Sequence, residues 1–247
     1  MTTFLRALPA DAADSLTTSG FVVLPSPVSP PDVERLQAMY DAACAQAAPE
    51  DVRVGRASTR VTDFVNRGPA FDWIYSWPPA LDAAGRVVGG PFRLSAFHAR
   101  TLHPGAPAQE LHVDVPRTSD AWPMLGLILM VDEFRPDNGA TRFVAGSHRW
   151  TELPENVLAD RVAAYPGEAM ACGSAGSVLL FDASTWHGHT ANASQAARRS
   201  LQATFIPRSG RPATNFAARM LPETLARLGS IARGVIGIEP DIDASSD

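Results

Sequence analysis

The sequence has few cysteines, and this scarcity excludes two kinds of protein. Only Cys44 and Cys172 occur in 247 residues. Two cysteines in a chain of this length do not make a disulfide scaffold, and they cannot supply a zinc site of four cysteines. We therefore expect two reduced, mostly buried thiols.

The sequence also lacks a membrane-spanning stretch and a strong excess of positive charge. No apolar run approaches the length of a transmembrane helix, and residues 1–15 hold Asp11 and Asp14 where a secretory signal would be apolar. The formal net charge is −5, and no basic run is longer than Arg198-Arg199, which argues against nucleic acid or an anionic membrane as a partner. We expect a cytoplasmic protein with a small-molecule substrate, as a monomer or a homodimer.

Proline and glycine are abundant, with 21 and 18 residues, and favour short segments joined by turns. Helical spacing of apolar residues predicts helices over 33–47 and 221–238. Residues 51–90 have irregular spacing and fit either short helical pieces or a loop that covers a pocket. Together with short apolar runs, this pattern indicates a mainly β protein, a β-sandwich or jelly roll braced by helices. The expected strands cover residues 21–24, 92–102, 111–115, 124–134, 141–144, 177–181, 186–191 and 200–207.

A His-x-Asp pair is the first candidate for chemistry. His112 and Asp114 lie one residue apart, so a strand would point both side chains to the same face, close enough to bind one ion. The pair alone is a weak signal, because it arises readily by chance. A third ligand has to come from elsewhere. His187 and His189 both follow the apolar run 178–181 and would face the same way, so their spacing alone does not rank them.

The chemistry of this set points to iron. Two imidazoles and one carboxylate on one face suit Fe(II) and leave three coordination positions open, enough for a bidentate keto acid and O₂. Arg198 and Arg199 follow His187 in the sequence. A guanidinium at a fixed distance from the metal can grip the far carboxylate of the keto acid with two parallel hydrogen bonds.

The spacing of the arginines predicts which one faces the site. If 187–191 and 198–205 form a hairpin, residue 187 lies opposite residue 198 and the two share a face. Arg198 then points inward, whereas Arg199 points to the other side. The alternative is a pair of surface charges at a hairpin tip. The same alternation would place Ser200, Gln202 and Thr204 along a polar cavity, with Leu201, Ala203 and Phe205 packed behind it.

These motifs jointly resemble the phytanoyl-CoA dioxygenase family of Fe(II)/2-oxoglutarate-dependent oxygenases, over most of the chain. Residues 20–24, with the proline-led helix after them, are similar to the family's opening segment. Residues 109–114 resemble its metal motif, 138–148 its central strand and turn, and 187–201 its closing motif. The resemblance implies a double-stranded β-helix. We expect one domain over 1–247, with the β-helix core about 92–207, a helical and loop region 1–91 and a C-terminal helix about 221–238.

The resemblance also implies roles for individual residues. It implies His112, Asp114 and His187 as iron ligands and catalytic centre, and Arg198 as the residue that binds the C5 carboxylate of 2-oxoglutarate. Gln109 and Thr141 match positions that contact 2-oxoglutarate in some members. Halogenating relatives have a small residue in place of the acid, so the acid at position 114 implies a hydroxylase or a related oxidase.

One position departs from the family. Two residues after the distal histidine, many members have a small hydroxyl residue, whereas this chain has His189. His189 can hydrogen-bond the co-substrate or the substrate, or replace His187 as ligand, and we prefer His187 as the ligand.

The remaining histidines and the aromatic residues have structural interpretations. His98 lies on an expected strand and could face the pocket, but we expect it to be a satisfied core histidine. We expect His103 to be a loop residue and His148 to brace a turn. A group of aromatic residues could wall a pocket, but aromatic side chains usually lie in the core. This group comprises Trp73, Tyr75, Trp77 and Trp122.

The expected function is an oxygenase that uses Fe(II), 2-oxoglutarate and O₂. It would hydroxylate or otherwise oxidise a small organic metabolite and release succinate and CO₂. The alternatives are a jelly-roll metalloenzyme without a keto acid and a catalytically silent binding module of the same fold. The family includes acyl-CoA, amino-acid-derived, terpenoid and alkaloid substrates. No cluster of basic residues in the sequence indicates a CoA site, which favours a small metabolite.

Overall fold

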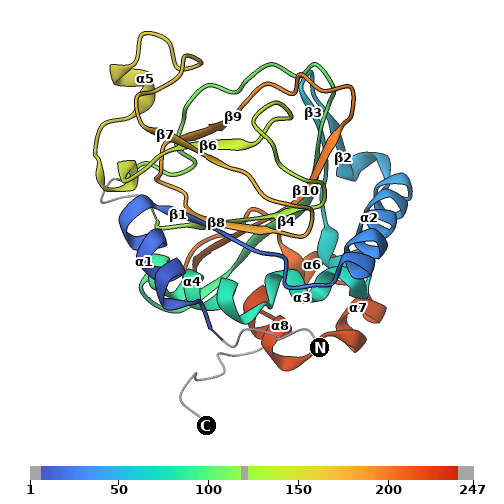
Figure 1. Ribbon diagram of the computed structural model, residues 1–247. Coiled ribbons are helices and arrows are strands. Elements are labelled where there is room, and N and C mark those ends of the chain that lie inside the picture. The colour runs from blue at the N-terminus through green and yellow to red at the C-terminus, as the bar shows by residue number, and fades with distance from the viewer. Residues whose placement is uncertain (1–6, 118–121, 239–247) are drawn as a thin grey trace.

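The computed structural model describes residues 7–117 and 122–238 and builds them around two antiparallel sheets that are not closed (Figure 1). The larger sheet has seven strands in the order β1-β8-β5-β10-β4-β3-β2, and the smaller has three in the order β7-β6-β9. The mainly β architecture with flanking helices is confirmed. The strands are β1 (Phe21–Leu24), β2 (Val52–Val54), β3 (Ser58–Val61), β4 (Phe92–Leu102), β5 (Leu125–Met130), β6 (Thr141–Val144), β7 (Glu168–Ala171), β8 (Val178–Asp182), β9 (His187–His189) and β10 (Arg198–Pro207).

The large sheet is covered on both faces, which explains its apolar central strand. All six residues of β5 are buried, because α4 packs on one face and the small sheet lies over the other (Figure 1). Strand β10 pairs with β4 on one side and β5 on the other, so its side chains alternate between the helical layer and the space between the sheets.

Helices α1, α3, α4 and α8 lie on the outer face of the large sheet, and α2 lies beside it (Figure 1). Prolines start α2 and α4, where the missing N–H costs no hydrogen bond. Gly20 and Gly89 end α1 and α4 in the left-handed conformation, with φ of 85° and 74°. The helices are α1 (Ala10–Ser19), α2 (Pro30–Ala45), α3 (Asp72–Tyr75), α4 (Pro78–Val88), α5 (Pro154–Val157), α6 (Phe216–Arg219), α7 (Pro222–Arg227) and α8 (Ser230–Ile236), with 3₁₀ turns η1 (Pro49–Asp51), η2 (Phe64–Asn66), η3 (Pro69–Phe71) and η4 (Ser147–Arg149).

Several expected elements differ from the structure. The helix expected over 221–238 is two helices, α7 and α8, because Leu228 is extended, with ψ of 128°, and Gly229 caps the second helix. The strand expected over 111–115 is reduced to one bridge between His112 and His187. Of the two alternatives left open for residues 51–90, the structure has helical pieces, including α3 and α4, and adds the short strands β2 and β3.

The hairpin expected between 187–191 and 198–205 is also wrong. Strand β9 pairs with β6 in the small sheet, whereas β10 lies in the large sheet. Asn192 carries the chain from one sheet to the other, since its side-chain amide donates to the carbonyls of His103 and Ala196. The connection is therefore a crossover held by an asparagine rather than a turn.

The cysteines and the four aromatic residues considered for a pocket wall differ in their burial. Neither cysteine is in a disulfide, but Cys172 is exposed, so the expected burial is wrong for that residue. Tyr75 and Trp77 lie in the core, while Trp122 is 46% exposed, and none of the four aromatic residues lines the cavity described below. Within the described ranges, no helix has the length and apolar character needed to cross a membrane.

Candidate active site

A cavity of about 370 Å³ lies between the two sheets. Strands β4, β5, β9 and β10 all contribute side chains to it, together with the segment that contains His112 and Asp114. The polar or ionisable residues along its wall are Arg60, Ser95, His98, Arg100, Gln109, His112, Asp114, Thr141, His187, His189, Arg198, Gln202 and Thr204.

The structure brings His112, Asp114 and His187 together. The carboxylate faces the Nε2 atoms of both imidazoles, with Oδ1 3.7 Å from His112 Nε2 and Oδ2 3.6 Å from His187 Nε2. Both distances are longer than a hydrogen bond and leave room for an ion among the three groups. In the part of the chain that the structure describes, these are the three residues whose potential ligand atoms gather within 4.8 Å of one another.

The backbone fixes the two histidines relative to each other. His112 N donates to His187 O and His187 N donates to His112 O, each at 2.9 Å. The segment before His112 can lie this close to β9 because residue 188 is glycine. A Cβ at Gly188 would lie 2.8 Å from the carbonyl oxygen of Gln109.

The hydrogen bonds of the two rings determine which nitrogen is free. His112 Nδ1 lies 3.0 Å from Glu110 O, and His187 Nδ1 lies 2.8 Å from Thr185 O. A carbonyl only accepts, so each Nδ1 carries the proton and each Nε2 presents its lone pair to Asp114. Burial lowers the pKa of His187, which keeps this imidazole neutral.

His189 lines the cavity but lies outside this group. Its ring donates from Nδ1 to Thr190 O at 2.9 Å, and it stands opposite Thr141 on β6. Burial lowers the pKa of His189 to about 4, so it is neutral near pH 7. The geometry therefore favours His187 over His189 as the third partner of His112 and Asp114.

Arg198 is a buried guanidinium that has no acidic partner among the described residues. Its side chain is only 2% exposed, lies 4.0 Å from the ring centre of Phe134, and leaves Nε without a hydrogen bond. Burial, followed by the nearby charge of Arg100, lowers the pKa of Arg198 to about 9. A charge held in this way needs an anion that the described chain does not supply.

Arg199 differs from Arg198 in the side of the sheet that it faces and in its ion pairs. It faces the other side of β10 and forms ion pairs with Asp132 at 2.6 Å and with Asp41 at 2.7 Å. The expected orientation of the two arginines is thus confirmed, although the hairpin on which it rested is wrong. The alternation of β10 alone produces it.

The other expected cavity residues lie where the alternation of β10 places them, with one exception. Gln202 and Thr204 line the cavity. Ser200 is fully buried and instead donates to Arg100 O. Gln109 and Thr141 also line the cavity, and Gln109 Nε2 lies 3.4 Å from His112 Nε2.

Sequence reasoning missed Arg60 and Arg100 as cavity residues, and it preferred a core position for His98, which lines the cavity. The signal for two of them was present, because Phe97 and Ala99 are core residues of β4, so His98 and Arg100 must face the other way. His98 bonds to Gln202 at 3.2 Å, and burial lowers its pKa to about 3. Arg60 had no such signal, since β3 was not expected. The predicted turn-bracing role of His148 is confirmed by its bond to Thr17 O.

Comparisons with known proteins agree with this geometry. The family model of phytanoyl-CoA dioxygenase (PhyH) matches residues 16–200. Among curated proteins, dioxygenase cdmA of Talaromyces verruculosus is 40% identical over 140 residues, which cover 52% of this chain and 44% of that protein. Dioxygenase trt7 of Aspergillus terreus is 28% identical over 227 residues, which cover 81% of this chain and 73% of that protein.

The fold itself matches a solved structure. HygX from Streptomyces hygroscopicus, with nickel and 2-oxoglutarate bound, superposes with a TM-score of 0.68 over 82% of this chain and 89% of that one. The identity is 17%, so this likeness establishes the jelly-roll fold and leaves the chemistry to be argued from the residues.

Proposed function

The chain belongs to the phytanoyl-CoA dioxygenase family, and from that premise we propose that it is an Fe(II)- and 2-oxoglutarate-dependent oxygenase. The substrate is a small organic metabolite, which is hydroxylated or otherwise oxidised while succinate and CO₂ are released. The named dioxygenases among its relatives support this proposal, as does HygX with 2-oxoglutarate bound.

The donor set fits a redox-active divalent metal. His112 and His187 would bind it through Nε2, and Asp114 would bind it through a carboxylate oxygen. Two neutral imidazoles and one carboxylate on one side of an ion are the set that non-haem Fe(II) oxygenases use. The carbonyls that accept from both Nδ1 atoms hold the rings in the tautomer that a metal requires.

The buried Arg198 beside this set is the single observation that carries the proposal. A guanidinium without an acid, shielded from water and close to a metal site, fits the distal carboxylate of 2-oxoglutarate. Arg198 would orient the co-substrate, and Gln109, Thr141 and His189 would contact it around the metal. Bound iron supplies the oxidising chemistry, while the surrounding chain positions the reactants and excludes water.

An anaerobic titration tests this proposal. Adding 2-oxoglutarate to the Fe(II)-loaded protein should produce a visible charge-transfer band, and aeration should then release succinate. Arg198→Gln should need about 10- to 100-fold more 2-oxoglutarate to reach the same band, as expected for the loss of hydrogen bonds to a charged group. Its neighbour offers the matched control, since Arg199→Gln leaves the cavity wall unchanged. A metalloenzyme that needs no keto acid, or a silent binding module, would give neither band nor succinate.

A further inference from the structure

Three arginines stand in one row across neighbouring strands of the large sheet. Arg53 on β2 is the direct partner of Arg60 on β3, and Arg60 is the direct partner of Arg100 on β4. Like charges at directly opposite positions destabilise a sheet. A fold that keeps such a row has a use for it, since violations of local rules in folded proteins concentrate at functional sites.

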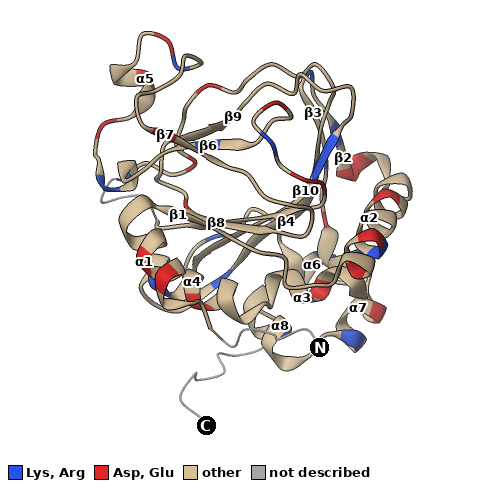
Figure 2. Cartoon of the chain, viewed as in Figure 1, with Lys and Arg blue, Asp and Glu red and all other residues tan. Residues whose placement is uncertain are grey.

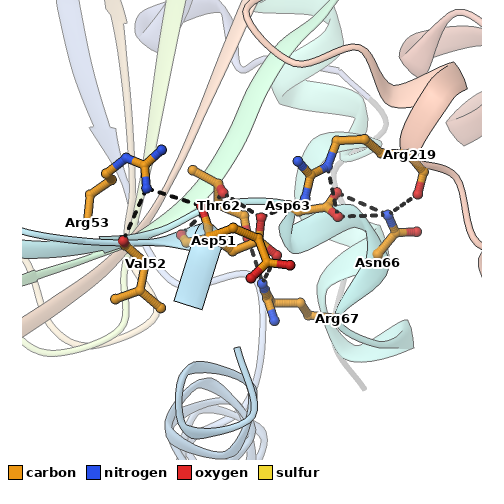
Figure 3. A network of polar contacts seen from close by, with 9 residues as sticks. Asp51, Val52, Arg53, Thr62, Asp63, Asn66, Arg67 and Arg219 are labelled. Carbon is orange, nitrogen blue, oxygen red and sulfur yellow. Dashed lines mark hydrogen bonds and ion pairs between the residues drawn. The ribbon is translucent and has the colours of Figure 1, made fainter. Parts of the chain in front are cut away.

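The inner two members of the row reach the cavity and form no ion pair with the described residues around it, although burial lowers the pKa of Arg100 and the nearby carboxylate of Asp114 opposes that shift. Arg60 and Arg100 both line it, and neither forms an ion pair or donates a side-chain hydrogen bond within residues 7–117 and 122–238. The Nε of Arg100 is buried and has no hydrogen-bond partner. Arg53, by contrast, does not line the cavity and donates to the carbonyl oxygens of Glu50 and Val52 (Figure 3).

The charges of the cavity do not balance without a further anion. Asp114 is the one carboxylate among its lining residues, against Arg60, Arg100 and Arg198. The histidines add no negative charge. In the proposed complex, the divalent metal offsets the two charges of 2-oxoglutarate, and Asp114 offsets one arginine. Two of the three arginine charges in the cavity then have no negative charge to offset them.

The positive charge of the cavity is opposite in sign to the net charge of the chain. The chain has a net charge of −5 and contains no lysine, so all 21 of its basic residues are arginine. Acidic residues recur along the outer helices α1 and α2 (Figure 2). A positive cavity in an acidic surface attracts and orients small anions.

We infer that the substrate is a small organic acid whose carboxylate is bound by Arg60 and Arg100. This inference rests on the proposed function. If Arg198 binds 2-oxoglutarate, the anion that binds Arg60 and Arg100 has to be a second molecule, the substrate. Two planar guanidinium groups side by side match the two oxygens of a carboxylate. Arg60, which is exposed, would meet the acid at the mouth, and Arg100 would hold it within reach of the metal ligands.

Calorimetry with a minimal acid tests the inference without knowledge of the substrate. Propanoate and propanamide have the same shape, and both are small enough to enter beside 2-oxoglutarate. Each is titrated into protein loaded anaerobically with Fe(II) and saturated with 2-oxoglutarate. Propanoate should bind at least about tenfold more tightly than propanamide, as expected for hydrogen bonds to a charged group.

Three variants locate the effect. Arg60→Gln and Arg100→Gln should each remove most of the preference for the acid and change the affinity for 2-oxoglutarate less than about threefold. Arg53→Gln, in the same row but outside the cavity, should keep the preference and shows that a lost charge alone is not the cause.

The outcomes separate the two proposals. Equal binding of acid and amide, or no binding of propanoate, overturns the substrate assignment while normal 2-oxoglutarate binding leaves the oxygenase intact. If Arg60→Gln or Arg100→Gln weakens 2-oxoglutarate as strongly as Arg198→Gln, these residues serve the co-substrate and the inference is wrong. If 2-oxoglutarate does not bind at all, the proposed function fails first.

Discussion

Two groups of arginines in this protein are partnered in opposite ways. Arg67 and Arg219 sit in a network beside η2, where Asp51 binds both of them, at 2.9 Å and 2.6 Å, and Asp63 binds Arg219 at 3.3 Å (Figure 3). The cavity arginines, Arg60, Arg100 and Arg198, form no ion pair with an acid of the described chain, and Asp114 is the one carboxylate in the cavity wall. The first group therefore holds the fold together, and the second is complete only with ligands.

The two groups are also connected. Asp63 lies two residues after the end of β3 and adopts φ of 63°, an uncommon conformation for a residue other than glycine. Asn66 donates to both oxygens of Asp63 and to Arg219 O, which ties this turn to α6. The paired network thus anchors the end of the strand that carries Arg60 into the cavity.

The largest expected effect breaks the site itself. Asp114→Ala should reduce metal affinity by more than about 100-fold, because even residues behind the ligands change it by 10- to 100-fold. His187→Ala should act similarly, whereas His189→Ala should retain the metal. Metal analysis of the purified variants after dialysis gives the result. Loss of metal in His189→Ala alone would reverse the assignment of the distal ligand.

The next effect separates a ligand-binding arginine from a structural one. Arg198→Gln should weaken 2-oxoglutarate by about 10- to 100-fold, the value of charged hydrogen bonds. The same change should leave the free energy of unfolding of the ligand-free protein unchanged or higher, because it removes a buried charge that no acid balances. Band titration and urea denaturation measure the two quantities. A large loss of stability would mean that Arg198 is structural.

The converse holds for the paired network. Arg67→Gln should lower the free energy of unfolding by about 3 kcal/mol, since it leaves Asp51 as a mostly buried charge with a partner missing. Its effect on 2-oxoglutarate affinity should be small. Arg219→Gln should cost less, because that side chain is 44% exposed. Equal and negligible losses in both variants would contradict the structural role of the network.

The smallest effect concerns pH. Burial lowers the pKa of His98 to about 3, so the unfolded chain takes up this proton near pH 6.5 and the folded chain does not. Stability is therefore lost as pH falls below about 6.5, and the loss continues toward pH 3. In His98→Gln, the fall between pH 6 and pH 5 should be smaller by about 1 kcal/mol. Urea denaturation at both pH values measures the difference, and identical falls would contradict it.

The spacing of apolar residues predicted the helices and strands whose limits are set by nearby residues. The strands over 21–24, 92–102 and 141–144 are confirmed at the expected residues, and the helix over 33–47 is confirmed as α2. The facing of Arg198 was predicted from a hairpin that does not form, and it holds because Arg198 and Arg199 alternate along β10. The expected extent of one domain over the whole chain and the cytoplasmic location stay predictions.

The failures have a common physical cause, which is pairing between distant segments. The partner of β9 is β6 rather than the next strand in sequence, and nothing in 187–205 encodes that choice. Arg60 and Arg100 are forty residues apart and meet only because β3 pairs with β4. A three-residue strand such as β2 carries too few side chains for a pattern. The positive charge of the cavity therefore could not be predicted from the sequence without knowledge of how the strands pair.

A crystal structure of the anaerobic complex with Fe(II) and 2-oxoglutarate tests the central claim most directly. We expect the metal about 2.1 Å from Nε2 of His112 and of His187, with Asp114 as the third protein ligand and the distal carboxylate of 2-oxoglutarate on Arg198. Arg60 and Arg100 should remain free to bind a second acid. A metal held elsewhere, or a keto acid whose distal carboxylate avoids Arg198, would contradict the account.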